Sequence, residues 1–332
     1  NSLALPAYAE YFCSVKDEKA LIAALDYARL HQLKVTPFGG GSNLVLAGDI
    51  SGLVVHLDIK GFSQRFQSDR VEVTFAAGEN WHQAVLTTLD QGWYGMENLS
   101  LIPGNMGAAP IQNIGAYGVE LADLFVSLRA IEISSGRQVS FDKAACQFGY
   151  RDSLFKNAAR DQYIILDVTL QLSTVAKINI HYPALSNAID SGVITGPLTA
   201  AKISALVCQI RREKLPDPSE IPNVGSFFKN PLVSSAVLSD LLVRYPQMPN
   251  YPQPDKCSKI PAAWLIDQCG FKGMMRGSVG VHKHQALVLV NDLRKGGGTG
   301  QQLLDLAEEL REGVWQRFAI RLELEPRVYG AS

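Results

Sequence analysis

The sequence at residues 101–118 reads LIPGNMGAAPIQNIGAYG. This stretch combines small residues, two prolines and amide side chains with almost no charge. A chain that runs flat along a large aromatic ligand needs little side-chain bulk and many backbone donors. Loops of this length without regular structure are uncommon unless they are functional. We therefore expect a ligand-binding segment here, and the simpler alternative is an irregular loop that lines the core.

A second glycine-rich segment lies upstream, where Gly39-Gly40-Gly41-Ser42-Asn43 follows a predicted strand. Consecutive amides in such a turn form a concavity that binds phosphate, and glycine lets the backbone approach the ligand closely. A plain turn between two strands is the alternative. The spacing is not G-x-G-x-x-G, and no Walker lysine follows. A Rossmann dinucleotide site and a P-loop are therefore both disfavoured.

The composition is that of a globular protein with no preference for polyanions. The 332 residues include 31 Lys+Arg and 32 Asp+Glu, which gives a formal net charge of −1, and 47% are hydrophobic. At roughly 150 residues per domain, this length predicts two or three domains. The near-zero charge argues against nucleic acid or an anionic membrane as the main partner. No apolar run approaches the ~18 residues that cross a bilayer.

The five cysteines are odd in number and scattered, with no C-x-x-C spacing. This pattern is typical of free thiols rather than of a disulfide framework. The first residues also lack the cationic and apolar regions of a signal peptide. We therefore expect a cytoplasmic protein.

The first third alternates predicted strands and helices. Predicted strands cover residues 11–15, 34–38, 52–57 and 71–76. One predicted helix is capped by Asp17 and has an apolar stripe from Leu21 to Ala28, and a second begins at Trp81 and closes near Gly92. This alternation favours an α/β or α+β fold.

The rest of the chain begins rich in strands and then alternates again. Predicted strands cover residues 128–134, 138–141, 163–172, 178–181, 286–291 and 320–324. Predicted helices run from the cap Thr199 to about Arg212, over 262–269 and over 301–318. The proline-rich stretches 215–218 and 245–254 are predicted loops or boundaries, because proline removes a backbone donor and fixes φ.

Three further motifs complete a recognisable set. They are FGYRDS at 148–153, GSFFKNP at 225–231 and WLID at 264–267. Together with the two glycine-rich segments, they make the chain resemble the MurB family, the UDP-N-acetylenolpyruvoylglucosamine reductases, from about Asn1 to Gly330. Five separate motifs in the family's order make chance a poor explanation.

The resemblance implies an α/β (α+β) architecture of the vanillyl-alcohol-oxidase/PCMH type, with two FAD-binding lobes and a third α/β lobe for substrate. The implied lobes are residues 1–60, to which 326–332 return, then 61–212, and the substrate lobe 213–325. It also implies FAD and NADPH as cofactors and reduction of an enolpyruvyl ether to UDP-N-acetylmuramate in peptidoglycan synthesis. The implied partners are UDP-GlcNAc-enolpyruvate and NADPH, with no nucleic acid, membrane or metal, and the chain is expected to be a monomer.

Both glycine-rich segments are implied to hold FAD. The residues are Gly39, Gly40, Gly41, Ser42, Asn43, Ile102, Pro103, Gly107, Ala108, Ala109, Ile111, Gln112, Asn113, Gly115, Tyr117 and Gly118.

The catalytic residues implied by the resemblance are Ser226, Arg151 and Glu325. Ser226 is implied to give a proton to the substrate α-carbon, although a lone serine after glycine is more often a cap or turn residue. Arg151 can fork onto the substrate carboxylate. Glu325 is implied to lie near the enolate; Glu323, two residues earlier on the same strand face, stays open as the alternative.

The substrate-binding residues implied are Tyr150, Tyr182, Lys214, Asn230 and Gln285. Tyr182 matches the tyrosine loop of the type I subclass, which folds over a pyrophosphate. For each of them, a plain solvated surface residue is the alternative.

Two other features are not assigned a ligand. His282-x-His284 has a spacing that can bind metal, but no further ligand set completes it, so surface histidines are expected. Gly296–Gly300 precedes a helix, and Thr299 is expected to cap that helix rather than bind nucleotide.

Two rival functions remain open at this point. One is an FAD-dependent sugar or alcohol oxidase on the same fold, although neither glycine-rich segment contains a His or Cys that would bond FAD covalently. The other is a non-catalytic sensor of nucleotide sugars.

Overall fold

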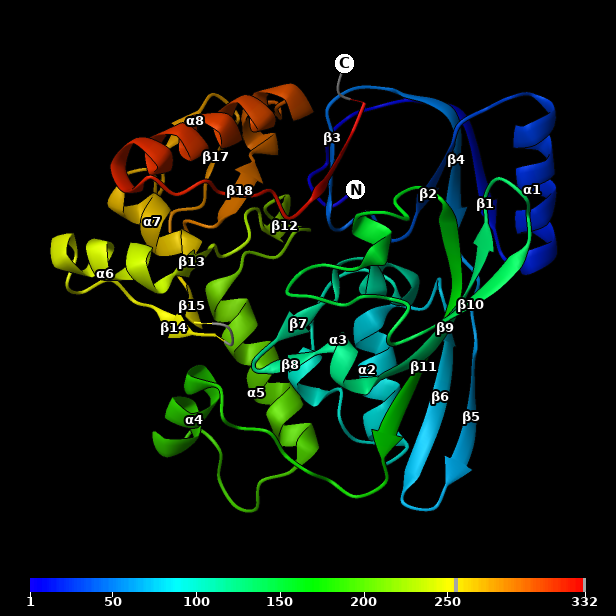
Figure 1. Cartoon of the computed structure of the whole chain (residues 1–332), viewed down its shortest axis with the longest axis horizontal. Helices are drawn as coiled ribbons and strands as arrows, with labels where there is room; N and C mark the ends of the chain where they lie inside the picture. Colours follow the sequence, from blue (N-terminus) through cyan, green and yellow to red (C-terminus); the bar gives the residue numbers. More distant parts are fainter. Residues whose placement is uncertain (254–255, 331–332) are drawn as a thin grey trace. The chain divides into compact units, whose positions relative to one another are not determined.

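The computed structural model describes residues 1–253 and 256–330 and divides into two compact units. The larger unit comprises Ala9–Gly41 and Ser51–Arg211. The smaller unit comprises Asn1–Tyr8, Ser42–Ile50 and the chain from Arg212 onward. Each unit is therefore assembled from segments that are not continuous in sequence (Figure 1).

The larger unit contains two main sheets. The first has the order β1-β4-β2, with β1 at Ala9–Val15, β4 at Ile50–Leu57 and β2 at Val35–Phe38. The second is antiparallel in the order β10-β9-β11-β6-β5, with β10 at Gln138–Asp142, β9 at Phe125–Glu132, β11 at Tyr163–Ser173, β6 at Arg70–Ala76 and β5 at Phe62–Gln67 (Figure 1).

Helices and short turns complete this unit. They are α1 (Glu18–Leu30), α2 (Trp81–Asp90), α3 (Leu121–Leu124), α4 (Pro183–Asp190) and α5 (Ala200–Lys214), the 3₁₀ turns at Glu97–Leu99, Met106–Gln112 and Leu154–Lys156, and the hairpin of β7 (Gly115–Ala116) and β8 (Val119–Glu120). Helix α1 starts where predicted, because the Asp17 carboxylate accepts the N–H of Ala20 at 2.7 Å. Its buried Leu21 and Leu25 pack with Leu53 and Val55 of β4.

The smaller unit contains an antiparallel sheet in the order β12-β18-β17-β16. These strands are Asn223–Ser226, Val288–Asn291, Val279–Val281 and Met275–Arg276. A second sheet has the order β13-β15-β14, at Leu232–Ser234, Cys257–Lys259 and Tyr251–Pro252. The helices are α6 (Ser235–Arg244), α7 (Ala262–Gln268) and α8 (Gly300–Phe318), with a 3₁₀ turn at Leu293–Lys295.

A late strand pairs with an early one inside the smaller unit. Strand β19 (Arg327–Tyr329) pairs in parallel with β3 (Leu44–Leu46), near opposite ends of the sequence (Figure 1). The backbones of Gly48 and Gly330 are so close that a Cβ on Gly330 would lie 2.2 Å from the Gly48 carbonyl oxygen. The final segment is thus tied to residues 44–48.

Most predicted elements are confirmed, but two predicted strands are wrong. Residues 178–181 form no strand; Ile178 and Ile180 pack on the apolar cluster around α5, and a side chain, Asn98, donates to the Asn179 carbonyl at 2.9 Å. In 320–324 only Leu324 makes a bridge, to Phe228. Ile320 and Leu322 are buried as the alternation predicts, so in both stretches burial, not strand pairing, explains the alternation.

The proline-rich stretches are connections as predicted. Residues 215–218 form no helix or strand, and 245–253 contain only the short β14. Pro254 of the second stretch lies outside the described residues. All five cysteines are free, and no helix in the described part of the chain has the length and apolarity needed to cross a membrane.

Candidate functional site

The two glycine-rich segments lie against each other in the larger unit. A Cβ built on Gly40 would come within 2.9 Å of the Asn105 Oδ1 and 3.4 Å of the Gly104 Cα. A side chain at position 40 would therefore collide with the second segment. The close approach explains why this strand end is followed by glycine.

The first segment presents several unused backbone donors. Among the described residues, the N–H groups of Gly39, Gly40, Gly41 and Ser42 donate no hydrogen bond. Backbone polar groups are nearly always paired, with protein, water or ligand. Consecutive amides of this kind are suited to phosphate oxygens.

The second segment is more regular than the predicted loop. Met106–Gln112 forms a 3₁₀ helix, followed by the hairpin of β7 and β8. Gly107 is packed so tightly that a Cβ there would lie 2.6 Å from the Ala77 Cβ. The flat wall suggested by the sequence is thus fixed against the end of β6.

Asn113 uses its side chain inside this segment. Its amide nitrogen donates to the Glu120 carboxylate at 2.7 Å and to the Gly149 carbonyl at 3.0 Å, and its amide oxygen accepts the Ala122 N–H at 2.9 Å. The residue is buried and has a positive φ of 44°. Its side chain therefore braces the segment, and its predicted contact with the cofactor stays a prediction.

Arg151 is placed directly beside the hairpin. Its guanidinium donates to the Gly115 carbonyl and lies 5.4 Å from the centre of the Tyr150 ring. A Cβ on Gly115 would lie 2.9 Å from Arg151 Nη1. The structure thus brings together Arg151, Tyr150 and Gly115, which the sequence assigned to catalysis, substrate and cofactor.

Tyr117 and Tyr182 form an aromatic pair in the same unit. Their ring centroids are 5.3 Å apart in an edge-to-face arrangement. Asn98, which the sequence analysis did not single out, donates to the Tyr117 carbonyl at 2.8 Å and to the Asn179 carbonyl at 2.9 Å. Burial raises the pKa of the Tyr117 phenol, and the Arg211 charge opposes that rise. The phenol is therefore neutral at pH 7.

Ser226 lies at the end of β12 in the smaller unit. It follows Gly225, which has a φ of 71° and donates its N–H to the Asn223 amide oxygen at 2.8 Å. The Ser226 hydroxyl makes no hydrogen bond to a described residue. Its hydroxyl therefore does not cap a helix, although the residue does end a strand.

The two candidate glutamates have different surroundings. Glu325 donates its N–H to the Phe227 carbonyl at 3.0 Å, so it lies beside the residue that follows Ser226. The Glu323 carboxylate pairs with the Lys229 ammonium at 3.0 Å, and its side chain is 72% exposed. The Glu323 side chain thus faces solvent, whereas the Glu325 backbone is bonded to the segment that carries Ser226.

Asn43 lies next to this glutamate within the smaller unit. Its amide nitrogen donates to the Glu325 carbonyl at 3.5 Å, and its own carbonyl accepts the Arg327 N–H at 3.1 Å. A residue assigned to the cofactor is thus next to one assigned to catalysis.

The other three substrate candidates belong to the smaller unit. Lys214 is exposed at the end of α5. The Asn230 amide oxygen accepts the Ala262 N–H at 2.9 Å and so supports the start of α7. Gln285 accepts the Leu287 N–H at 3.4 Å in the turn before β18.

Of the two features left without a ligand, the predicted helix cap is confirmed, and only one of the two histidines is exposed. Thr299 caps α8 in a reciprocal capping box with Gln302. His284 is exposed, but His282 is partly buried, and burial lowers its pKa; its Nδ1 has no partner among the described residues. The described residues contain no group of three or more His, Cys, Asp or Glu that could hold a metal.

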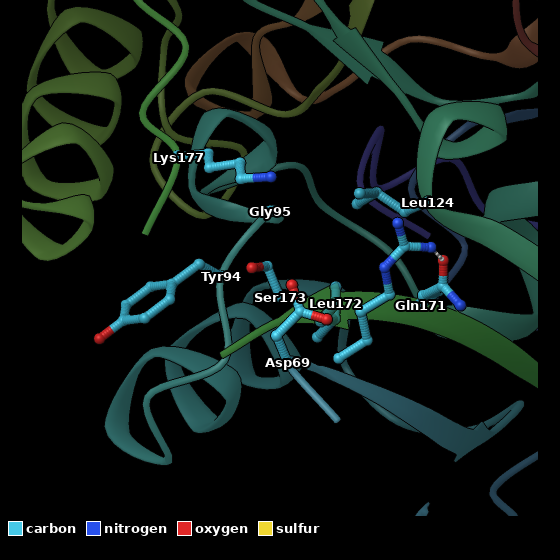
Figure 2. Close-up of a pocket in the computed structure, with 9 residues that line it drawn as sticks. Asp69, Tyr94, Gly95, Leu124, Gln171, Leu172, Ser173 and Lys177 are labelled. Carbon is cyan, nitrogen blue, oxygen red and sulfur yellow. Dashed lines mark hydrogen bonds between the residues drawn. The ribbon is translucent and has the colours of Figure 1, made fainter. Parts of the chain in front are cut away.

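A separate cavity of about 230 Å³ lies in the larger unit (Figure 2). Its lining is Asp69, Arg70, Tyr94, Gly95, Leu124, Gln171, Leu172, Ser173 and Lys177. Arg70 donates to the Gln171 amide oxygen at 2.8 Å, and Figure 2 shows the Tyr94 ring directed away from the other side chains. None of the predicted site residues lines this cavity, so it is not the candidate site.

Comparison with known proteins gives consistent matches over the whole chain. Residues 9–142 match the model of an FAD binding domain, and residues 217–329 match that of the UDP-N-acetylenolpyruvoylglucosamine reductase C-terminal domain. The chain is 48% identical over 328 residues to UDP-N-acetylenolpyruvoylglucosamine reductase of Cupriavidus pinatubonensis, covering 99% of this chain and 96% of the relative. It is 47% identical over 332 residues to that of Ralstonia nicotianae, with the same coverage.

A solved structure agrees at the level of the fold. The crystal structure of MurB from Thermus caldophilus aligns with a TM-score of 0.66 and 21% identity, covering 99% of this chain and 95% of that chain. The predicted FAD-binding fold is thus confirmed.

Proposed function

The chain belongs to the UDP-N-acetylenolpyruvoylglucosamine reductase family, and from this membership we propose that it reduces UDP-GlcNAc-enolpyruvate to UDP-N-acetylmuramate for peptidoglycan synthesis. The reductant is NADPH and the cofactor is FAD. The observation that carries the proposal is the contact of Gly40 with Gly104 and Asn105, inside the segment that matches an FAD binding domain.

The residues of the larger unit fit FAD. The unused amides of Gly39, Gly40 and Gly41 suit a pyrophosphate, and the 102–118 segment supplies a wall of small side chains. When bound, FAD supplies the two-electron reduction that no side chain can perform. The chain's own residues must then hold the substrate and deliver a proton.

We assign the proton to the Ser226 hydroxyl. Because no described residue bonds this hydroxyl, it is available to the substrate α-carbon. A serine hydroxyl is a weak acid, so it serves only against a strongly basic carbanion in a site that excludes water. A positioned acid of this kind contributes roughly 10²–10⁴ in rate.

We assign stabilisation of the developing negative charge to Arg151 and Glu325. The planar guanidinium of Arg151 matches a carboxylate in a bidentate fork. A protonated Glu325 carboxyl can share a hydrogen bond with the enolate. Its position beside Phe227 supports this role over that of Glu323.

Substrate grip is assigned to Tyr150, Tyr182, Lys214, Asn230 and Gln285. A UDP-sugar presents a pyrophosphate and a planar uracil, which aromatic, amide and cationic side chains recognise. The exposed Tyr182 at the start of α4 supports the type I tyrosine-loop assignment.

We also propose that NADPH and the sugar nucleotide occupy one site in turn. This order predicts ping-pong kinetics and inhibition by excess sugar nucleotide, which blocks NADPH. Initial-rate measurements over both substrate concentrations test it, and intersecting double-reciprocal lines would contradict it.

The central test follows the colour of the purified protein without oxygen. Added NADPH is expected to bleach the yellow absorbance, and added enolpyruvyl substrate to restore it. A nucleotide-sugar sensor would show no such cycle. An oxidase would recover its colour only with oxygen, and covalent flavin in an acid precipitate would favour that rival.

The remaining assignments concern organisation and location. We propose three lobes, residues 1–60 with 326–332, then 61–212 and 213–325, and residues 331–332 lie outside the described part. We propose a monomer in the cytoplasm, where NADPH and UDP-sugars are available. Sedimentation and cell fractionation test these two points.

A further inference from the structure

Helix α5 carries a ladder of polar side chains on one face. Ser204, Cys208 and Arg211 are spaced at i, i+4 and i+7, so they line one side of the helix. The neighbouring Ile203, Leu206, Val207 and Ile210 bury their side chains in a cluster against which Tyr117 packs. The ladder thus lies on a largely buried helix.

Ser204 and Cys208, the first two residues of the ladder, have polar partners within the protein. The Ser204 hydroxyl bonds the Ser100 hydroxyl at 2.7 Å, and the Cys208 sulfur lies 3.9 Å from His82 Nε2. Because His82 Nδ1 accepts the Leu101 N–H at 3.0 Å, the neutral ring carries its proton on Nε2 and donates it to the sulfur. Ser100 directly precedes the ligand-binding segment 101–118, and His82 bonds its first residue, Leu101.

Arg211, the third residue of the ladder, lacks a hydrogen-bond partner at its Nε in the described part of the chain. Arg211 Nε is sealed from solvent, has no hydrogen-bond partner among the described residues, and no described carboxylate pairs with the guanidinium. Its electrostatic neighbours are Tyr117, Cys208 and the like-charged Arg151, and burial is the main cause of its lowered pKa. A buried cation beside a second cation is costly unless an anion joins them.

We propose that Arg211 binds an oxyanion of the sugar-nucleotide substrate, next to Tyr117 and Arg151. This inference rests on the proposed function for the identity of the ligand. Arginine suits the role, because its planar fork matches a carboxylate or a phosphate. The substrate offers both groups, and the shared chemistry is a planar or tetrahedral oxyanion that needs more than one N–H donor.

The test compares three variants of the oxidised holoenzyme by calorimetric titration. Arg211→Met keeps the length of the side chain but removes its charge, and Arg211→Lys keeps the charge but removes Nε. Arg212→Met is the matched control, since Arg212 is the adjacent, exposed arginine. The probes are UDP-GlcNAc-enolpyruvate and UDP-GlcNAc, which lacks the carboxylate.

Arg211→Met is expected to weaken binding of the enolpyruvyl compound roughly 10- to 100-fold. Arg211→Lys should bind this compound several-fold more weakly than the parent protein does. The affinity of Arg212→Met should stay within about twofold of the parent value. An equal loss for UDP-GlcNAc assigns the diphosphate, and a loss confined to the enolpyruvyl compound assigns the carboxylate; either supports the proposal.

Unchanged affinity of Arg211→Met for both probes would overturn the proposal, as would loss of FAD with intact sugar-nucleotide binding. If Arg211→Met does not fold, an unchanged affinity in Arg211→Lys decides against it. Failure of the proposed function is a separate result. In that case the parent protein binds the probes, but the substrate does not restore the flavin colour.

Discussion

At the scale of single residues, the site depends on which polar groups are already occupied. Asn113 and Glu323 look like ligand-binding residues in the sequence, yet one braces its own segment and the other pairs with Lys229. Ser226 has the opposite character, because its hydroxyl makes no bond to a described residue. The unoccupied groups are therefore the better candidates for chemistry.

Replacement of Ser226 by alanine tests the proton assignment. Ser226→Ala is expected to retain FAD and its bleaching by NADPH, and to slow recovery by the enolpyruvyl substrate by roughly 10²–10⁴. Stopped-flow absorbance separates the two half-reactions. Ser63→Ala on the exposed β5 is the control, and normal recovery in Ser226→Ala would remove the serine from the mechanism.

The two glutamates are separated by paired substitutions. Glu325→Gln should slow recovery of the flavin colour by about 10²–10³, because it removes a group near the developing charge. Glu323→Gln breaks only an exposed ion pair, so it should change stability by no more than about 1 kcal/mol and leave the rate unchanged. The reverse ranking in the same stopped-flow assay would transfer the role to Glu323.

At the scale of elements, the ligand-binding segment owes its shape to a few internal braces. The sequence located both glycine-rich segments, because composition and strand ends are local signals. Their contact at Gly40 and Asn105 joins residues distant in the chain, so the pattern could not reveal it. Helix caps such as Asp17 and Thr299 were predictable, since each bonds within its own first turn.

Removal of the Asn113 brace should loosen this segment. Asn113→Ala deletes three hydrogen bonds of a buried amide, and the free energy of unfolding should fall by about 2–4 kcal/mol. Flavin affinity should fall with it. Urea unfolding and flavin fluorescence measure the two effects, with the exposed Asn157→Ala as control. Unchanged flavin binding would show that the segment keeps its shape without the brace.

The two wrong strands share one physical cause. Alternating apolar residues predict which side chains are buried. Ile178 and Ile180 indeed pack on an apolar cluster, and Ile320 and Leu322 are buried. The pattern does not say where the backbone hydrogen bonds go. Here Asn98 takes the Asn179 carbonyl and Arg311 takes the Leu322 carbonyl at 3.0 Å. The choice between Glu323 and Glu325 likewise needed the observed pairing with Phe227 and Lys229.

At the scale of the whole molecule, strands β3 and β19 join an early segment of the chain to a late one. Gly330 has a φ of 70°, and a Cβ there would strike the Gly48 backbone. Gly277 has a similar φ of 62° but open space around it. An added side chain at Gly277 would therefore meet only backbone strain, whereas one at Gly330 would meet both strain and a steric clash.

Alanine substitutions at the two glycines measure how much the β3–β19 pairing contributes to stability. Gly277→Ala should cost about 1–2 kcal/mol for its left-handed backbone, and Gly330→Ala should cost clearly more because the strand pair must also separate. Thermal unfolding compares them. Equal losses of stability in the two variants would mean that separating β3 from β19 does not destabilise the protein.

Stability at high pH should reflect the buried thiol of Cys146. Burial raises the pKa of this thiol from 9.0 to about 12, so the folded state resists forming the thiolate. The contribution is complete below pH 9 and is lost as the pH rises toward 12, by at most about 1.4 kcal/mol per pH unit. Cys146→Ala should therefore unfold with a shallower pH dependence than the parent protein between pH 9 and 12. Urea titrations at each pH give the free energy of unfolding. The same pH dependence in both proteins would contradict a raised pKa of the Cys146 thiol.

The chain passes between the two units four times, after Tyr8, Gly41, Ile50 and Arg211. Neither unit can consequently be produced as one uninterrupted fragment. A gene split at Arg211 would yield a carboxyl-terminal piece without Leu44–Leu46, the strand that Arg327–Tyr329 requires. Joining the two termini and reopening the chain elsewhere would not help, because both units would still be interrupted at Gly41 and Ile50. Neither unit can therefore be exchanged between proteins by simple end-to-end fusion.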